Sequence, residues 1–178
     1  MAARELFTER GYAAVGTEQI VARAKVTRGA LYHHFEDKRD LFRAVFERVE
    51  EELVTRIAAK MKAADDSWEL MLAGMRAFLD ACDRPDVKQI SLTDAPAVLG
   101  WSEWREIDNR YGLGLTRAAL QGAVDAGAVR PIAIEPMAHL LVAALSEAAF
   151  FIAHSRHPRK ARAEVEEALL QLAEGLRA

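Results

Sequence analysis

The sequence predicts an all-α protein, and three features of its composition support this. The chain has 178 residues and a mass of 19.7 kDa, and 51% hydrophobic with 29% charged residues can both bury a core and keep it soluble. Ten Gly and five Pro are few for a sandwich or barrel, which needs turn residues every ~8–12 positions. Ala, Leu, Glu and Arg dominate instead, and these residue types favour helices.

Helical spacing and capping residues predict three short helices at the start of the chain. The first ends at Gly11, because glycine commonly stops a helix. Thr17 and Thr27 are suitable N-caps for the second and third helices, since a threonine hydroxyl accepts a bond from a free backbone N–H. The predicted ranges are 3–10, 18–24 and 28–34.

Six further helices follow in the prediction. Asp37, Asp66 and Ser102 are N-cap residues in front of apolar residues at helical spacing. Pro136 and Pro158 stand where a first-turn proline belongs. The predicted ranges are 37–62, 66–82, 87–92, 102–126, 136–154 and a last helix from Pro158, with a loop through Pro96 and Gly100. The total is nine helices and no strand.

The sequence also argues against several classes of protein. A single cysteine excludes a disulfide framework and a multi-thiolate metal site within one chain. We expect no membrane span of ~18 apolar residues, because the most apolar stretch contains His139, Ser146 and Glu147. The N-terminus lacks the apolar region of a signal peptide, and the motifs of nucleotide-binding and hydrolytic enzymes are absent. A cytoplasmic protein without catalytic residues, cofactor, metal or membrane partner is therefore expected.

The charges are distributed unevenly along the chain. Residues 1–46 hold eight Lys/Arg and six Asp/Glu, a net charge of +2. Residues 47–178 have a net charge of −5, which gives the whole chain its net charge of −3. No acidic residue lies between Ala22 and Phe35. This pattern indicates a small surface that faces nucleic acid on an otherwise acidic protein. A solvated helix face is the alternative that charge alone leaves open.

Residues 17–41 carry the most specific signal. Two short capped helices with a break of a few residues have the layout of a helix-turn-helix, whose second helix enters the major groove. Arg28 begins that second helix and can reach O6 and N7 of a guanine, while Gly29 allows DNA to approach closely. Helix N-termini and side-chain donors nearby can hold phosphates. The predicted DNA-binding residues are Thr17, Thr27, Arg28, Gly29, Tyr32, His33 and Lys38.

This region resembles the DNA-binding domain of the tetracycline-repressor (TetR) family of bacterial transcriptional regulators. The resemblance covers ARELFTERGYAAVGTEQIVARAKVTRGALYHHFEDKRDLF, and its most diagnostic part is YHHF followed by an acidic residue and Lys38. It implies a nine-helix, two-domain architecture, with a DNA-binding domain at residues 1–46 and a ligand-binding and dimerisation domain at 47–178. The family's first helix usually begins some residues earlier, so a basic N-terminal arm would lie outside this sequence.

The last two predicted helices carry apolar stripes that exceed what one small core needs. Two such helices from each of two copies can form a two-fold four-helix interface. The alternative is that both helices simply close the core of the monomer. The predicted interface residues are Leu141, Leu145, Ala148, Leu169 and Leu172.

The resemblance also implies a ligand pocket among the middle helices. Methionine and aromatic side chains there can form adaptable walls, and a few polar groups can orient a small molecule. Ordinary core packing is the alternative for each of these residues. The predicted pocket residues are Met75, Phe78, Trp104, Asn109, Tyr111 and His139.

A lone cysteine and a pair of histidines are weak candidates for a redox-sensing site and a metal site, respectively. Cys82 lies near Arg84 but on an apolar face, which favours burial over redox sensing. His154 and His157 lack a third metal ligand. The predicted function is therefore a dimeric repressor that a small-molecule effector releases from a palindromic operator. The alternatives are an interaction or ligand-sequestering protein of the same fold that no longer binds DNA, and a small-molecule enzyme on a helical scaffold.

Overall fold

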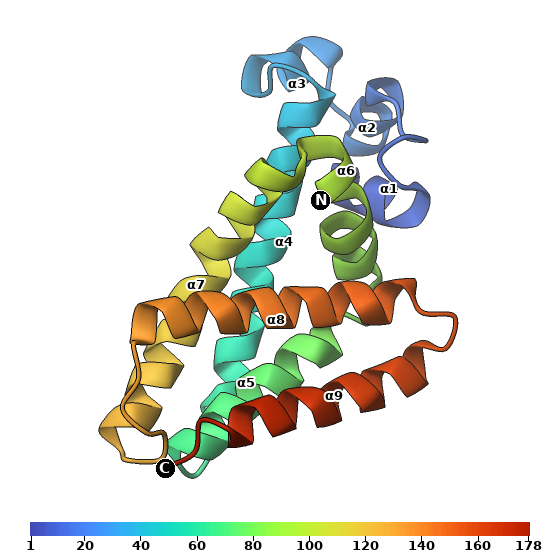
Figure 1. Ribbon diagram of the computed structural model, residues 1–178. Helices are drawn as coiled ribbons and strands as arrows, with labels where there is room; N and C mark the ends of the chain where they lie inside the picture. Colours follow the sequence, from blue (N-terminus) through green and yellow to red (C-terminus); the bar gives the residue numbers. More distant parts are fainter. The chain divides into compact units, whose positions relative to one another are not determined.

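The computed structural model describes residues 1–178 and is all-α, as predicted (Figure 1). It contains nine α-helices and a π-helix, η1, and its only β feature is an isolated bridge between Val129 and Arg177. The elements are α1 (Ala2–Arg10), α2 (Thr17–Ala24), α3 (Arg28–His34), α4 (Lys38–Met61), α5 (Ser67–Ala81), η1 (Val87–Asp94), α6 (Ala95–Leu99), α7 (Trp101–Asp125), α8 (Ile134–His154) and α9 (Pro158–Glu174).

The chain forms two compact units that are interleaved in sequence. The first joins Met1–Glu51 to Arg84–Ile107, and the second joins Glu52–Asp83 to Asp108–Ala178. Helices α4 and α7 each contribute residues to both units. In the structure, η1, α6 and the start of α7 therefore pack with the N-terminal helices. The predicted domain boundary at residue 46 divides the chain at one point of the sequence and does not include this second segment.

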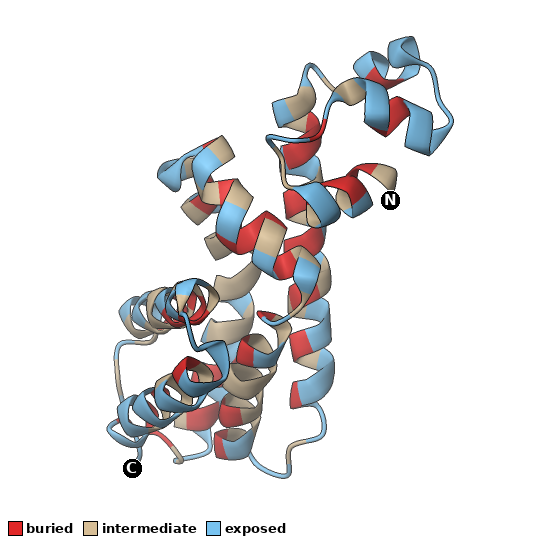
Figure 2. Ribbon diagram, turned by 90° about the vertical axis from the view of Figure 1, so that its right-hand side faces the viewer, coloured by how far each residue is buried: buried red, intermediate tan, exposed pale blue.

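Aromatic rings form the centre of the first unit. Phe7 of α1 and Phe42 of α4 are fully buried, and their ring centroids are 5.3 Å apart in an edge-to-face arrangement. Tyr12 completes the cluster, with its centroid 5.0 Å from that of Phe42. The buried positions of α1 are visible beside the N-terminus in Figure 2. Helix α1 packs against α2, and α2 packs against α3; these two helices contribute the buried residues Ile20, Val21 and Leu31.

Three apolar clusters and an ionic network hold the second unit together. Arg162 of α9 pairs with Asp80 of α5 at 2.7 Å and with Glu166 on its own helix. Arg76 of α5 also bonds Glu166, at 3.1 Å. Helices α8 and α9 lie side by side (Figure 1). The buried cluster residues are Trp68, Leu72, Leu120, Ala123, Val129, Ala173 and Leu176; Leu79, Ala148, Ile152, Ala161 and Leu169; and Leu53, Ile57, Met61 and Ala119.

The start of α2 differs from the prediction. The helix begins at Thr17, and Gly16 rather than Thr17 is its N-cap. The side chain of Gln19 explains the shift, because its Oε1 accepts the Gly16 N–H at 3.1 Å and so satisfies the backbone in front of the helix. The assignment of Thr17 as the N-cap is therefore wrong by one residue.

The segment between η1 and α7 also differs. Where the sequence predicts a loop, the structure has the short helix α6. Pro96 fits in its first turn, because a backbone N–H there has no partner within the helix and the lack of one in proline costs nothing. Gly100, at φ 83°, ends α6 in a conformation that other residues rarely adopt, and α7 starts at Trp101 rather than at Ser102. Only a single glycine thus separates the two helices.

Helix α8 is long and apolar enough to cross a membrane by length and composition alone, with a mean hydropathy of 1.6. The apolar run is thus longer than expected, because a helix that contains His139, Ser146 and Glu147 still reaches this mean hydropathy, while the absence of a membrane span stays a prediction. Core helices of soluble proteins meet the same criterion, and α8 packs against α5 and α9. Its polar Ser146 is buried, and its single hydroxyl proton lies between two acceptors, Val142 O at 2.9 Å and Asp108 Oδ2 at 3.1 Å from Oγ.

Replacing Phe42 tests the role of the aromatic centre. We expect Phe42→Ala to lower the free energy of unfolding by about 3–5 kcal/mol, because it leaves a cavity and removes two edge-to-face contacts. Urea denaturation followed by circular dichroism measures the change. The control Val26→Ala, at a side chain that is 47% exposed, should cost no more than ~0.5 kcal/mol. Equal losses for the two variants would contradict the assignment.

Candidate nucleic-acid interface

Helices α2 and α3 form the predicted helix-turn-helix. Lys25 ends α2 in the left-handed region at φ 57°, and it is the only non-glycine residue with positive φ. The Val26 N–H then donates to Val21 O at 3.1 Å, which closes the end of the helix. Thr27 Oγ1 accepts the Ala30 N–H at 3.1 Å, so Thr27 caps α3 as predicted. The turn therefore fixes Arg28 as the first residue of α3.

The exposed face of α3 presents hydrogen-bond donors to solvent. Arg28 pairs with Glu18 at 3.1 Å, and its guanidinium lies 5.4 Å from the centre of the Tyr32 ring. Tyr32 is 39% exposed, and His33 and His34 are exposed with ring centroids 5.3 Å apart. The side chains of Arg28 and Glu18 are 65% and 73% exposed, so their ion pair is weak and Arg28 is readily released to a ligand.

Gly29 has no evident reason within the chain to be a glycine. It lies inside α3, outside the left-handed region, and an added Cβ would meet only Thr27 Oγ1, at 3.9 Å. A glycine near the start of a helix costs stability relative to alanine. The space that it leaves open is outside the protein, on the surface that a helix-turn-helix turns to DNA.

Lys38 has a structural role that the sequence analysis missed. Its Nζ donates to Tyr12 O and Val15 O, both at 2.9 Å, and lies 3.9 Å from the centre of the Tyr12 ring. The ammonium therefore holds the loop between α1 and α2 against the start of α4. The predicted phosphate contact would have to use the third N–H and stays a prediction. No local pattern reveals this role, because the partners are 23 or more positions away.

The predicted ligand-pocket residues belong to both units. Trp104 belongs to the first unit, is 2% exposed and donates its indole N–H to Ser91 O at 3.1 Å, and its place in a ligand pocket stays a prediction. His139 is exposed on α8, where its Nε2 lies 3.6 Å from Glu135 Oε1, and its role as a polar anchor of the pocket stays a prediction. The remaining four are half-buried in the second unit: Met75, Phe78, Asn109 and Tyr111.

The predicted interface residues also divide. Ala148 and Leu169 are buried in a core cluster of the monomer, and Leu141 and Leu145 pack against core clusters from partly buried positions. Leu172 of α9, in contrast, is 60% exposed. Leu140, which lies in the apolar stripe expected on this helix, is 64% exposed, and Phe151 of α8 is 56% exposed. Their spacing of eleven residues, three helical turns, places both on one face.

Comparisons with known proteins agree with this geometry. Residues 1–45 match the bacterial regulatory proteins of the tetR family, and residues 68–176 match the tetracyclin repressor-like C-terminal domain. The second match alone covers more than half of the chain. The protein belongs to the TetR family. Residue by residue, the N-terminal match contains α1, α2, α3 and the start of α4.

The chain is also similar to individual proteins along much of its length. A TetR-family transcriptional regulator from Pectobacterium atrosepticum has a crystal structure with a TM-score of 0.91 at 35% identity, covering 99% of this chain and 91% of that one. The transposon Tn10 TetC protein of Escherichia coli is 27% identical over 78% of this chain and 70% of its own length. The transcriptional activator FasR of Mycolicibacterium smegmatis is 36% identical, over 45% of this chain and 36% of its own length.

The protein is a DNA-binding transcriptional regulator with a TetR-like, all-α fold. The matched N-terminal region contains the helix-turn-helix, and its exposed α3 face is the part that can meet DNA. Regulators of this family are soluble and generally not enzymes. Because curated relatives include both an activator and the repressor BepR of Brucella suis, family membership does not fix the direction of regulation.

Substituting Gly29 separates folding from DNA binding. We expect Gly29→Ala to leave the melting temperature unchanged or raise it, since alanine gains up to ~1 kcal/mol in a helix and no atom obstructs the Cβ. Its affinity for a specific duplex should nevertheless fall at least several-fold. Gly112→Ala is the matched control in α7, with equally open space, and should keep full affinity. Unchanged DNA affinity in Gly29→Ala would show that DNA does not approach this position.

Proposed function

We propose that the protein is a dimeric repressor that leaves a palindromic operator when a small-molecule effector binds. The observation that carries the DNA-binding part is the α3 face around Gly29, where the chain leaves open space beside exposed donors, of which Arg28 is held only by an exposed ion pair with Glu18. Two-fold symmetry of a dimer would present two such helices about 34–36 Å apart, one turn of DNA. Such a regulator acts in the cytoplasm, where its operator lies.

We assign separate roles to the exposed side chains of α3. Arg28 stands at the N-terminal end, which in a helix-turn-helix meets base edges, and its planar guanidinium matches O6 and N7 of a guanine. Tyr32 and His33 lie one turn further along and offer donors to the phosphate backbone. Thr17 and Thr27, at the starts of α2 and α3, place backbone N–H groups where phosphates can bind.

The base-reading role of Arg28 gives a distinct binding signature. With a duplex selected by the wild-type protein from a random pool, Arg28→Ala should cost about 1–3 kcal/mol and relax the preference at one position of each half-site. Fluorescence anisotropy against the selected and a random duplex measures both effects. Glu18→Gln removes the ion-pair partner of Arg28 and should retain the preference. Equal losses of Arg28→Ala on both duplexes would refute base reading.

Exposed apolar residues on α8 and α9 support the proposed dimer. Leu140, Phe151 and Leu172 are the large hydrophobic residues of these two helices that remain more than half exposed. Small residues beside them, among them Ala144 and Ala168, allow helices to approach closely. A second copy related by a two-fold axis would cover this surface with the same surface of its own.

The dimer is tested by charge at an exposed position. We expect Leu172→Glu to give a folded monomer in light scattering, because Leu172 is 60% exposed and contributes little to the monomer core. Leu169→Glu is unsuitable, since it would bury a charge and unfold the chain. Arg159→Glu at the other end of α9, an exposed polar position, is the control. A Leu172→Glu protein that stays dimeric would exclude this interface.

The effector would bind in the second unit, among residues of α5 and α7. Met75 and Phe78 are partly buried, and each packs against two of the three apolar clusters of the second unit. The flexible Met75 side chain can adjust to the shape of a ligand. Tyr111 and Asn109 on α7 are half-buried and supply polar atoms. These properties fit a small, mainly apolar molecule with one or two hydrogen-bonding groups. A compound screen by thermal shift, repeated with the selected duplex present, tests for an effector that competes with DNA.

A further inference from the structure

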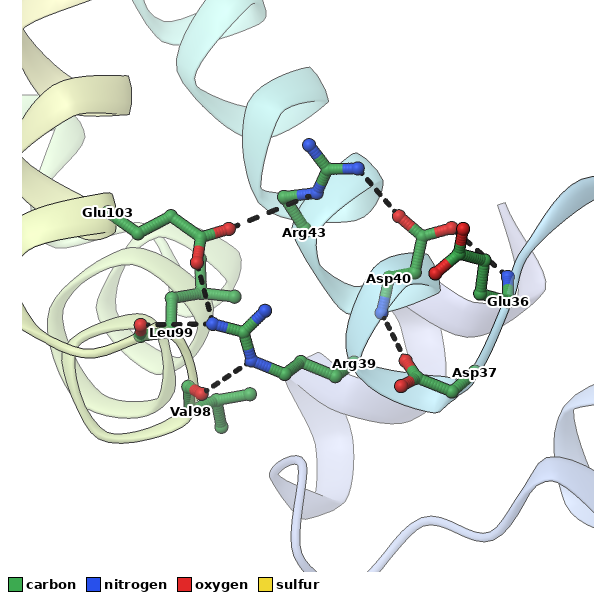
Figure 3. A network of polar contacts seen from close by, with 8 residues as sticks. All are labelled: Glu36, Asp37, Arg39, Asp40, Arg43, Val98, Leu99 and Glu103. Atoms are coloured by element: carbon green, nitrogen blue, oxygen red, sulfur yellow. Dashed lines mark hydrogen bonds and ion pairs between the residues drawn. The ribbon is translucent and has the colours of Figure 1, made fainter.

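Arg39, in the first turn of α4, binds the ends of two helices at once (Figure 3). Its Nε donates to Val98 O at 3.2 Å, and its Nη2 donates to Leu99 O at 3.1 Å. The same Nη2 lies 2.6 Å from Glu103 Oε2. Val98 and Leu99 are the last residues of α6, whereas Glu103 belongs to the first turn of α7. One guanidinium therefore connects three acceptors on either side of the α6–α7 junction.

The junction itself has one residue that favours bending. Gly100 has φ 83°, and a Cβ at this position would meet no atom within 4 Å, so the glycine is required by the backbone conformation and not by space. The last carbonyls of α6 have no partner inside that helix, and an arginine at a helix C-terminus satisfies them. Because Arg39 holds carbonyls before Gly100 and a carboxylate after it, a change in the angle between α6 and α7 must break at least one of its bonds.

Lys38, the residue before Arg39, binds the loop that leads into the helix-turn-helix. Lys38 holds Tyr12 O and Val15 O in the loop that leads into α2. The same loop is bound from η1, because Asp94 Oδ2 accepts the Tyr12 N–H at 2.8 Å. Lys38 and Arg39 thus connect the first turn of α4 to the front of the helix-turn-helix and to the α6–α7 junction, respectively.

A second contact joins η1 to the helix before this loop. Asp86 pairs with Arg4 of α1 at 2.5 Å and with Arg84 at 2.8 Å. Burial of the Asp86 carboxyl raises its pKa. The hydrogen bonds and positive charges of Arg84 and Arg4 lower it by more, so the pKa of Asp86 lies below its ordinary value. Asp86 therefore remains charged and keeps α1 attached to η1 at neutral pH.

The contribution of Arg39 to folding stability is small. The side chains of Arg39 and Glu103 are 44% and 32% exposed, and exposed ion pairs contribute ~0–1 kcal/mol. Arg43 approaches Glu103 at 3.9 Å but is bonded at 2.7 Å to Asp40, whose pKa is lowered by that hydrogen bond. The contribution of Arg39 therefore lies in geometry, because its planar guanidinium directs its donors toward three acceptors, whereas a lysine ammonium has no fixed plane.

We propose that Arg39 is a positioning residue for operator binding, and that Glu103 is its partner. Together they hold the α6–α7 junction in the arrangement in which the first turn of α4 presents the helix-turn-helix to specific DNA. Releasing this contact lowers specific affinity without removing any group that touches DNA. The inference rests on the DNA-binding function and extends it to residues of the C-terminal family region, outside the helix-turn-helix.

Glu103→Gln gives the decisive experiment, because electrostatics and positioning predict opposite signs. Removing a negative charge should by itself leave DNA affinity unchanged or raise it. Positioning predicts instead a loss of at least fivefold for the duplex selected by the wild-type protein, with unchanged affinity for a random duplex. Arg39→Lys keeps the charge but not the fork, and should show the same selective loss. The double variant Arg39→Lys/Glu103→Gln should lose no more than the larger single loss.

Controls separate this role from folding and from failure of the broader function. Glu51→Gln removes an exposed carboxylate on α4 that is paired with Arg48, and this variant should bind like the wild type. Melting temperature and stoichiometric titration report the folded, active fraction, and both should match the wild type. Operator affinity of Glu103→Gln equal to or above that of the wild type, or multiplied losses in the double variant, would overturn the proposal. A wild-type protein that selects no duplex would instead overturn the DNA-binding function itself.

Discussion

The fold of the DNA-reading part depends on the first turn of α4. Lys38 and Arg39 are adjacent in sequence, and each donates to two backbone carbonyls in a different part of the first unit. The helix-turn-helix is short, since α2 and α3 have eight and seven residues, and helices of this length are not stable alone. They keep their positions because the loop before them and the aromatic cluster behind them are both attached to α4.

The unit that contains the helix-turn-helix is therefore built from two separate segments of the chain, Met1–Glu51 and Arg84–Ile107. Residues 84–107 contribute Asp86, Asp94, Leu99 and Glu103 to contacts with α1, with the loop after it and with α4. These contacts are mostly polar and partly exposed, so each is individually weak and easily exchanged for water. Such contacts can position one element against another and still rearrange at low cost, which is the property that a regulated DNA-binding surface needs.

Much of the fold could be predicted from the sequence, because helix periodicity and caps are local signals. The caps Thr27 and Asp66 and the first-turn Pro158 were predicted correctly from residue type alone. The shifted cap at Gly16 was missed because it depends on the rotamer of Gln19. The site was predicted less completely. Arg28 and Gly29 follow from motif position, whereas the contacts of Lys38 and Arg39 join residues 23 to 64 positions apart and have no local signature.

The central claim is that residues outside the helix-turn-helix belong to the DNA-reading unit. Hydrogen–deuterium exchange measured by mass spectrometry, with and without the selected duplex, tests it most directly. The account predicts that the specific duplex slows exchange not only in residues 17–34 but also in residues 11–16 and 95–103, and that a random duplex does not. Slower exchange confined to residues 17–34, with 95–103 unchanged, would contradict it.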